Sequence, residues 1–198
     1  MGYAQKVVTM SEEEYLAIER KALAKSEFYD GHPCAMAGGT LSHNLIAGNV
    51  FRLLANHLSQ KPCRPFIGDV RLKAAAHRSY FYPDVLVVCD KKAYIAPDMV
   101  NDATVIVEVL SPSTASFDLS DKFHFYQSLP SLQEYVLIHQ EKMLVTVHRR
   151  QDGRSWLTHL LVQPENLLEL PSLEFKGTLA EVYQNVELPP LDETPQTS

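Results

Sequence analysis

The stretch Thr104–Thr114, TVIVEVLSPST, contains an almost continuous run of β-branched and aliphatic residues with one glutamate, Glu108, inside it. Apolar residues occupy both alternating faces of this run, which is typical of a strand that lies inside a sheet and is covered on both sides. An ionised carboxylate in such a place is costly unless it has a partner. We therefore expect Glu108 to be protonated, paired with a basic side chain, or bound to a metal.

A second acidic residue stands at the head of another apolar run. In YFYPDVLVV (Tyr80–Val88), Asp84 follows Pro83, a residue that is tolerated at the first position of a strand. Taken singly, Asp84 is most simply a capping or turn aspartate, and Glu108 is as well explained by a buried salt bridge. If the two strands are neighbours, the carboxylates can converge, and hard oxygen ligands of this kind suit Mg²⁺ or Mn²⁺. Together the two residues favour a metal site.

Helices are expected in four parts of the chain. A capping box at Ser11–Glu14 begins the first helix, and the clearest amphipathic stripe predicts a long helix within Leu41–Gln60. A third helix is expected over Ser116–Pro130, with Asp118 as its cap, and a short one over Leu179–Tyr183. These helices flank the apolar runs and are expected to pack on a sheet.

The remaining runs predict strands, and the whole order predicts a mixed α/β, or α+β, domain with a central mixed sheet flanked by helices. Asp30-Gly31 predicts a two-residue hairpin turn. We expect one domain over residues 1–188 and a disordered Pro-rich tail over 189–198. Tyr135–His139 and Leu144–His148 are candidate edge strands for pairing between subunits. The other strands are expected within Cys63–Ala74, Phe81–Cys89, Glu134–Gln140, Leu144–Arg150 and Trp156–Val162.

Composition limits the class of protein. The chain has 198 residues, and no apolar stretch approaches the roughly 20 residues that span a bilayer, so we expect a cytoplasmic protein without a membrane segment. Its three cysteines, Cys34, Cys63 and Cys89, form no CxxC pair and are expected to be free thiols. The net charge of −6 is unusual for a nucleic-acid-binding protein. Any DNA binding must then rest on a local patch or a second subunit.

Three segments carry a resemblance to a known family. They are KSEFYDGHPCAMAGGTLSHNLIAGNVFRLL at Lys25–Leu54, YPDVLVV at Tyr82–Val88, and the stretch TVIVEVLSPSTASFDLSDKFHFYQSLPSLQEYVLI at Thr104–Ile138. Over Met10–Tyr183 the chain resembles the Uma-two family of restriction-endonuclease-like domains. The resemblance implies the fold of the PD-(D/E)xK nucleases, in which a mixed sheet carries a divalent-metal site at its edge.

The resemblance also implies site residues. Asp84 matches the aspartate of the Pro-Asp motif and Glu108 matches the second acid, and these two are the implied metal ligands. The wider superfamily has a lysine two residues after that acid, where this chain departs from the pattern with Leu110. The matching lysine is implied to be Lys122, in the next helix. Glu27 matches an N-terminal acidic residue that completes the metal shell or holds a second ion.

The implied activity is a Mg²⁺- or Mn²⁺-dependent endonuclease that hydrolyses DNA and works as a homodimer. Asp84 and Glu108 would hold the metal, and Lys122 would stabilise charge on the phosphate or orient water. Two alternatives stay open because the chain is acidic: a non-catalytic protein that keeps the fold for binding or assembly, and a hydrolase of a non-nucleic phosphodiester. Lesser candidates near the site or its groove are His43, Asp69, Arg71 and Lys73.

Overall fold

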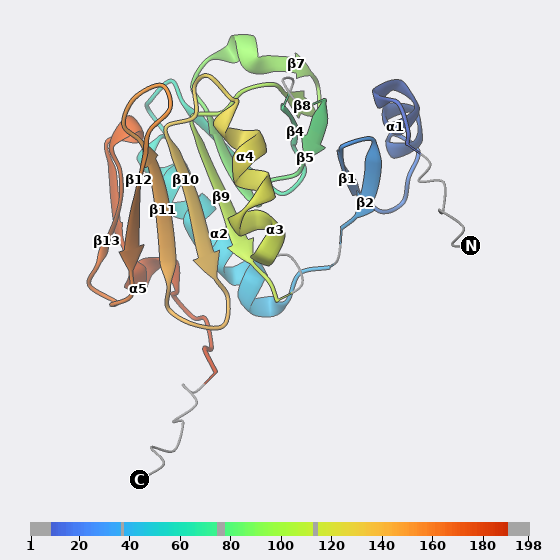
Figure 1. Ribbon diagram of the computed structural model, residues 1–198. Coiled ribbons are helices and arrows are strands. Elements are labelled where there is room, and N and C mark those ends of the chain that lie inside the picture. The colour runs from blue at the N-terminus through green and yellow to red at the C-terminus, as the bar shows by residue number, and fades with distance from the viewer. Residues whose placement is uncertain (1–8, 37, 75–77, 113–114, 190–198) are drawn as a thin grey trace.

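The computed structural model describes residues 9–36, 38–74, 78–112 and 115–189. These residues form two six-stranded sheets, a two-stranded sheet and five α-helices (Figure 1). The first sheet, here the N-terminal sheet, has the strand order β2-β1-β5-β4-β8-β7. The second, here the central sheet, has the order β12-β11-β10-β9-β6-β3.

The elements have the following bounds. The N-terminal sheet contains β1 (Ser26–Tyr29), β2 (His32–Ala35), β4 (Arg71–Ala74), β5 (Ser79–Phe81), β7 (Tyr94–Ala96) and β8 (Met99–Val100). The central sheet contains β3 (Arg64–Ile67), β6 (Val85–Val88), β9 (Val105–Leu110), β10 (Glu134–His139), β11 (Val145–Arg150) and β12 (Trp156–Leu161). The small sheet pairs β13 (Leu167–Leu170) with β14 (Phe175–Thr178). The helices are α1 (Glu12–Glu19), α2 (Leu41–His57), α3 (Ala115–Leu119), α4 (Asp121–Gln127) and α5 (Leu179–Val182).

The central sheet is mixed and covered on both faces, as expected. Strand β9 runs parallel to β10 and antiparallel to β6, and all six of its residues are buried. Figure 1 shows α2 on one face of this sheet, and α3 and α4 on the other. Side chains of α2 pack with Val107 and Val109, whereas those of α4 pack with Ile106 and Leu110. This double cover explains why β9 lacks an alternating polar face.

Helix α2 forms where the apolar stripe predicts it. Thr40 caps its first turn, because its side chain accepts a hydrogen bond from the backbone N–H of His43. Ile46, Val50 and Leu54 recur every four residues and are all buried against the central sheet. The start of α2, with His43, therefore lies at the end of the sheet where β6 begins.

The β1–β2 hairpin also forms as expected. Asp30 and Gly31 have φ angles of 51° and 82°, both left-handed, as a two-residue turn between twisted strands requires. Phe28 of β1 stacks on Tyr15 of α1, with ring centroids 4.7 Å apart, and α1 begins with the predicted capping box. This small aromatic cluster holds β1 in place and orients its neighbouring residue, Glu27.

Two expectations about helices and edges are wrong. The predicted helix over Ser116–Pro130 is two short helices, α3 and α4, and Asp118 is a buried residue of α3 and caps neither. The candidate edge strands lie inside the sheet, because β10 pairs with β9 and β11, and β11 pairs with β10 and β12. The outer strands of the central sheet are β12 and β3.

The expectation of three free thiols is also wrong. Cys63 and Cys89 form a disulfide, and Cys34 is free and half-buried. The antiparallel register that pairs Arg64 with Val88 brings the two flanking cysteines opposite each other, although 26 residues separate them in sequence. Disulfides are most frequent in oxidising compartments, so the cytoplasmic location stays a prediction.

The predictions about the tail, the membrane and the domain boundary can be compared with the structure only in part. Residues 190–198 of the Pro-rich tail lie outside the described residues. None of the helices in the described part of the chain is long and apolar enough to cross a membrane. The assignment of residues 1–188 to one domain stays a prediction.

Two leucines of α2 test how the helix is held. Leu54 is fully buried and Leu41 is 86% exposed. We expect Leu54→Ala to lower the free energy of unfolding by about 2–5 kcal/mol, since it leaves a cavity against the sheet. Leu41→Ala, the matched control, should have almost no effect in the same urea titrations. Equal effects of both substitutions would contradict the packing of α2 described above.

Candidate active site

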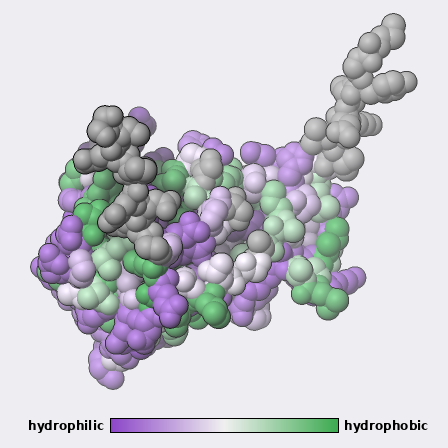
Figure 2. Space-filling view, turned by 90° about the horizontal axis from the view of Figure 1, so that it is seen from below, coloured by the Kyte–Doolittle hydropathy of each residue, from purple (hydrophilic) through white to green (hydrophobic). Residues whose placement is uncertain are grey.

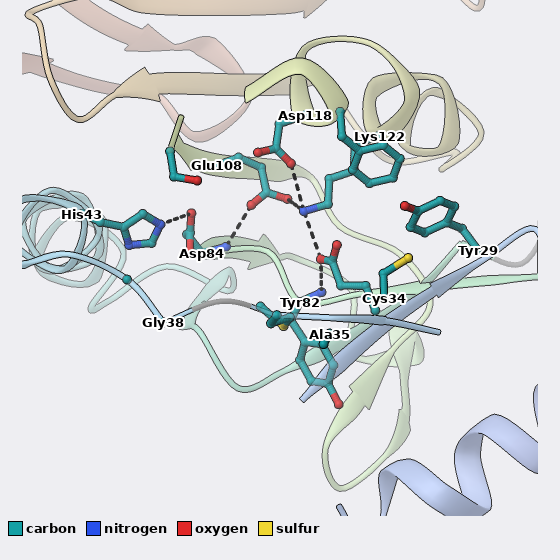
Figure 3. A pocket seen from close by; sticks show the side chains of 15 residues that line it. Tyr29, Cys34, Ala35, Gly38, His43, Tyr82, Asp84, Glu108, Asp118 and Lys122 are labelled. Carbon is teal, nitrogen blue, oxygen red and sulfur yellow. Dashed lines mark hydrogen bonds and ion pairs between the residues drawn. The ribbon is translucent and has the colours of Figure 1, made fainter. Parts of the chain in front are cut away.

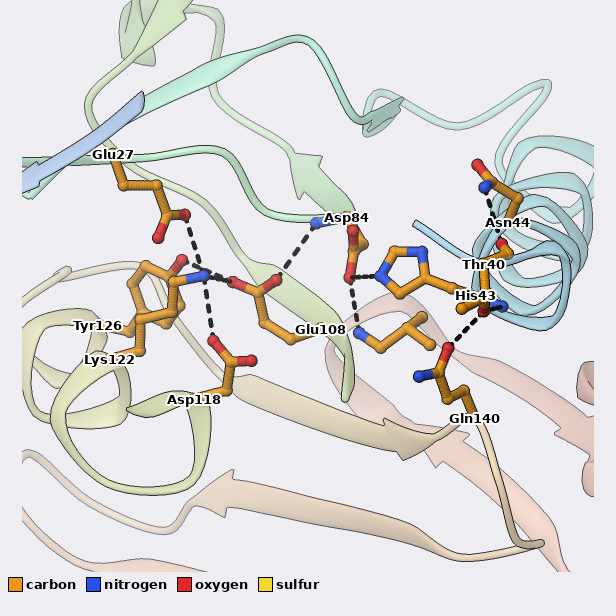
Figure 4. A network of polar contacts seen from close by, with 11 residues as sticks. Glu27, Thr40, His43, Asn44, Asp84, Glu108, Asp118, Lys122, Tyr126 and Gln140 are labelled. Atoms are coloured by element: carbon orange, nitrogen blue, oxygen red, sulfur yellow. Dashed lines mark hydrogen bonds and ion pairs between the residues drawn. The ribbon is translucent and has the colours of Figure 1, made fainter. Parts of the chain in front are cut away.

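Asp84 and Glu108 meet because of the register between β6 and β9. Val85 pairs with Val107 in this antiparallel pair, so the preceding residue, Asp84, stands opposite Glu108. Residues opposite one another across two strands project their side chains to the same face. Glu108 Oε2 lies 3.4 Å from the backbone N of Asp84, and the backbone N–H of Val109 donates to Asp84 Oδ2 at 2.7 Å (Figure 4).

Lys122 reaches the same place from α4. Its Nζ lies 3.1 Å from Glu108 Oε1, 3.0 Å from Glu27 Oε1 and 3.1 Å from Asp118 Oδ1 (Figures 3 and 4). The three carboxylates come from β9, β1 and α3, respectively. Each of these four side chains belongs to a residue that exposes less than a tenth of its surface. We call them, together with Asp84, the carboxylate–lysine cluster.

Two further side chains hold the carboxylates in position. The hydroxyl of Tyr126 donates a hydrogen bond of 2.8 Å to Glu108 Oε1. His43 Nε2, at the start of α2, lies 3.2 Å from Asp84 Oδ2. This contact with Asp84 raises the pKa of His43, although partial burial opposes the effect. Asp84 and Glu108 are thus each fixed by a contact from outside their own strands.

Burial and the opposite charges nearby shift the pKa values of Glu108 and Lys122 in opposite directions. Burial raises the pKa of Glu108 well above its usual range, and Lys122 only partly offsets this. Burial by itself would lower the pKa of Lys122, but Glu108, Glu27 and Asp118 raise it well above its usual value. The lysine therefore stays charged. Four carboxylates around one ammonium group leave an excess of negative charge at the site.

The cluster forms one wall of a cavity of about 330 Å³. Other parts of the wall come from the β1–β2 hairpin, the start of α2 and α3. Figure 3 shows His43 and Tyr29 at opposite ends of this cavity, with Lys122 between them. The cavity is also lined by Cys34, Met36, Tyr82 and Phe117.

Most of the chain is similar to known proteins. Residues 12–180 match the model of the Uma2 family, which is described as "Putative restriction endonuclease". This chain belongs to the Uma2 family.

Two relatives of this Uma2 protein come from Synechocystis sp. (strain ATCC 27184 / PCC 6803 / Kazusa), and both are uncharacterized. The protein sll1609 is 39% identical over 146 residues, which cover 73% of this chain and 82% of sll1609. The protein slr1290 is 32% identical over 177 residues, which cover 89% of this chain and 93% of slr1290.

A solved structure shares the fold. It is described as "a putative nuclease belonging to DUF820 from Anabaena variabilis ATCC 29413" and superposes with a TM-score of 0.72. The alignment covers 88% of this chain and 97% of that one, at 18% sequence identity. The restriction-endonuclease-like fold expected from the sequence is thus confirmed, and family and fold together support a nuclease-type hydrolase.

The structure brings together all four residues that the sequence predicted for the site of this Uma2 protein, Glu27, Asp84, Glu108 and Lys122. Their catalytic and metal-binding roles stay predictions. Asp69 does not line the cavity; it lies exposed and pairs with Lys25, while the adjacent Gly68 donates a backbone hydrogen bond of 3.0 Å to the carbonyl oxygen of Asp84. Of the lesser candidates, Arg71 is buried beside Tyr82 and Asp98, and Lys73 pairs with Glu12.

Two members of the site were missed by the sequence reasoning. Asp118 was interpreted as a helix cap, and Tyr126 received no role. Asp118, Lys122 and Tyr126 stand four residues apart, a spacing that places side chains on one face of a helical segment. That spacing was the available signal, and it points all three toward Glu108.

The oxygen atoms at the site suit a small divalent cation. Within the described residues, no three His, Cys, Asp or Glu side chains are arranged as ligands of one metal. Mg²⁺ requires fewer than three protein ligands, because it keeps several bound waters and takes only one or two carboxylates from a protein. Asp84 and Glu108 provide two carboxylates, and the surplus of negative charge around them favours a cation. The donor set therefore fits Mg²⁺ or Mn²⁺.

Removing Lys122 tests whether its charge compensates the buried carboxylates around it. We expect Lys122→Met to lower the free energy of unfolding by about 3–5 kcal/mol at neutral pH, because it leaves buried carboxylates uncompensated. Since burial raises the pKa of Glu108 above its unfolded value, the deficit relative to wild type should shrink as the pH falls through that raised pKa.

Lys176→Met is the matched control for this prediction. Lys176 also pairs with a glutamate, Glu169, but both side chains are well exposed, so its loss should leave the free energy of unfolding almost unchanged. Urea unfolding of both variants across the pH range measures the difference. A Lys122→Met protein as stable as wild type at neutral pH would contradict the charged, buried cluster.

Proposed function

We propose that this protein is a metal-dependent endonuclease that hydrolyses phosphodiester bonds of DNA, with Mg²⁺ or Mn²⁺ held by Asp84 and Glu108. The observation that carries the proposal is the position of Lys122. Its ammonium group is held 3.1 Å from Glu108, which stands opposite Asp84 across two strands, and all three line one cavity. Two acids on neighbouring inner strands, with a lysine beside them, can hold a metal ion and a phosphate next to each other.

Each residue has a definite task in this mechanism. Bound at Asp84 and Glu108, the metal would polarise the phosphate and lower the pKa of a bound water. Lys122 would donate a hydrogen bond to a phosphate oxygen as negative charge builds there, in exchange for one of its three carboxylate contacts. Glu27 and Asp118 hold the ammonium group beside Glu108 before the substrate arrives.

The two metal-binding carboxylates are held in position before any ligand binds. Tyr126 fixes Glu108 through its hydroxyl, and the backbone N–H of Val109 and the ring of His43 fix Asp84. Because these contacts come from β9, α2 and α4, the position of the site depends on the packing of the whole central sheet. Such pre-organisation is a general requirement of catalytic sites.

The alternative of a non-catalytic scaffold explains the cluster less well. A buried network of charges is expensive, and apolar residues of similar volume can often replace one without loss of stability. A protein that needed only the fold would gain nothing from Glu27, Glu108, Asp118 and Lys122. The acidic surface does favour one other candidate, hydrolysis of a non-nucleic phosphodiester, which would use the same residues.

The homodimer also stays a prediction. The strand expected to pair between subunits changes from β10 or β11, which lie inside the sheet, to β12. In the central sheet β12 is an outer strand, and Leu157 and Leu160 on it are exposed. A second copy could pair along this strand, as edge strands commonly do.

Substitution of the metal ligands tests the proposed reaction. We expect Asp84→Asn and Glu108→Gln to lower Mg²⁺-dependent plasmid cleavage at least about 100-fold, since each removes a charged ligand that contributes several kcal/mol to the transition state. Glu165→Gln changes an exposed glutamate between β12 and β13 that does not line the cavity, and it should cleave like wild type. Full activity of Glu108→Gln, or cleavage that persists in EDTA, would refute the metal-dependent mechanism.

A further inference from the structure

The basic side chains of the cavity are already engaged. Among the described residues that line it, only His43 and Lys122 are basic. Lys122 contacts three carboxylates, and His43 contacts Asp84. Near the cavity, on the N-terminal sheet and the segments beside it, Lys25 pairs with Asp69 and Lys73 with Glu12.

This charge pattern limits how many phosphates the cavity can bind. A protein that grips duplex DNA typically makes about 6–10 contacts between basic side chains and phosphates, and its affinity then falls steeply with salt. Here the lining is acidic and the whole chain carries a charge of −6. With a divalent cation at Asp84 and Glu108, one phosphate can be held, but the cavity offers little attraction to the phosphates beyond it.

Aromatic side chains supply a different kind of contact at the far end of the cavity. The rings of Tyr29 and Phe117 stack, with centroids 4.5 Å apart and planes 26° apart, and both residues line the cavity. Phe81 and Phe125 pack behind Tyr29, at 6.1 Å and 6.0 Å, and are buried. The stacked pair is therefore supported from within, while Tyr29 and Phe117 are only half-buried.

We infer that the cavity takes one nucleotide from a single-stranded segment or a strand end. Its phosphate lies at Asp84 and Glu108 and takes the place of one carboxylate contact of Lys122, and its base lies against Tyr29 and Phe117. A volume of about 330 Å³ is at the lower end of small-ligand sites, which suits one nucleotide. A base inside a duplex cannot reach such a wall unless it leaves the stack.

This inference rests on the proposed function and specifies its substrate. Stacking on aromatic side chains depends on the flat face of the base, which every nucleotide has, so it tolerates any sequence and needs no basic side chain. An acidic protein can thus bind a nucleic acid through bases where it lacks the basic residues to bind many phosphates.

An internal competition between two substrates tests the inference. A twelve-nucleotide single strand and a blunt hairpin duplex of the same sequence carry different fluorophores and are mixed with the wild-type protein and Mg²⁺. The ratio of initial cleavage rates then gives the ratio of kcat/KM directly. We expect the single strand to be cleaved at least tenfold faster.

Salt and two variants provide independent readouts. With one or two phosphates bound, raising salt from 50 to 200 mM should lower single-strand cleavage by less than about tenfold, compared with roughly 10³–10⁵ for 6–10 phosphate contacts. Phe117→Leu keeps an apolar side chain but removes the ring, and should lower single-strand kcat/KM by about 5- to 150-fold, the range of one base–aromatic stack. Tyr94→Leu, a half-exposed aromatic on β7 outside the cavity, is the matched control.

The outcomes separate the inference from the proposed function. Equal or faster cleavage of the duplex, or a salt dependence of 10³-fold or more, overturns the inference and leaves the endonuclease intact. Phe117→Leu protein that melts like wild type and cleaves the single strand at the wild-type rate also overturns it. No cleavage of either substrate overturns both proposals.

Discussion

The ammonium group of Lys122 is the contact on which the geometry of the site depends. It lies within 3.1 Å of carboxylates from three separate segments, Glu27 on β1, Glu108 on β9 and Asp118 on α3. A buried cation needs such compensation, because burial otherwise favours its neutral form. The contacts form only if α4 packs on β9 and the β1–β2 hairpin lies beside α3 and α4. The cluster therefore joins the two large sheets at one point, beside Asp84.

Much of this arrangement could be predicted from local patterns. The unbroken apolar run around Glu108 indicated a strand covered on both faces, and the Asp30-Gly31 turn indicated the hairpin that carries Glu27. The place of Lys122 came from the family resemblance, although its four-residue spacing from Asp118 and Tyr126 was a local sign that the three side chains share one face. Register and strand order were not predictable, since both depend on contacts between distant segments. For this reason the disulfide of Cys63 with Cys89 and the true edge strands were missed.

Lys122 lies on helix α4 and not on β9, the strand that carries Glu108. This position has a structural consequence. A residue two positions along the strand would be held by the ladder itself, whereas Lys122 needs its own supports. Asp118, one turn earlier, and Glu27, from the hairpin, provide them. These supports add negative charge around the cavity, which favours a divalent cation and disfavours a long polyanion. The displaced lysine, the acidic lining and the aromatic wall thus form one consistent description of a site for a single nucleotide.

The most direct test of the central claim is anomalous X-ray diffraction from crystals grown with Mn²⁺. The account predicts an anomalous peak within coordination distance of one carboxylate oxygen of Asp84 and one of Glu108, with Lys122 beside it. The peak should vanish in crystals of Glu108→Gln grown in the same way. No peak at this position in well-ordered wild-type crystals, or a peak that survives in Glu108→Gln, would show that the two carboxylates are structural and would contradict the metal site.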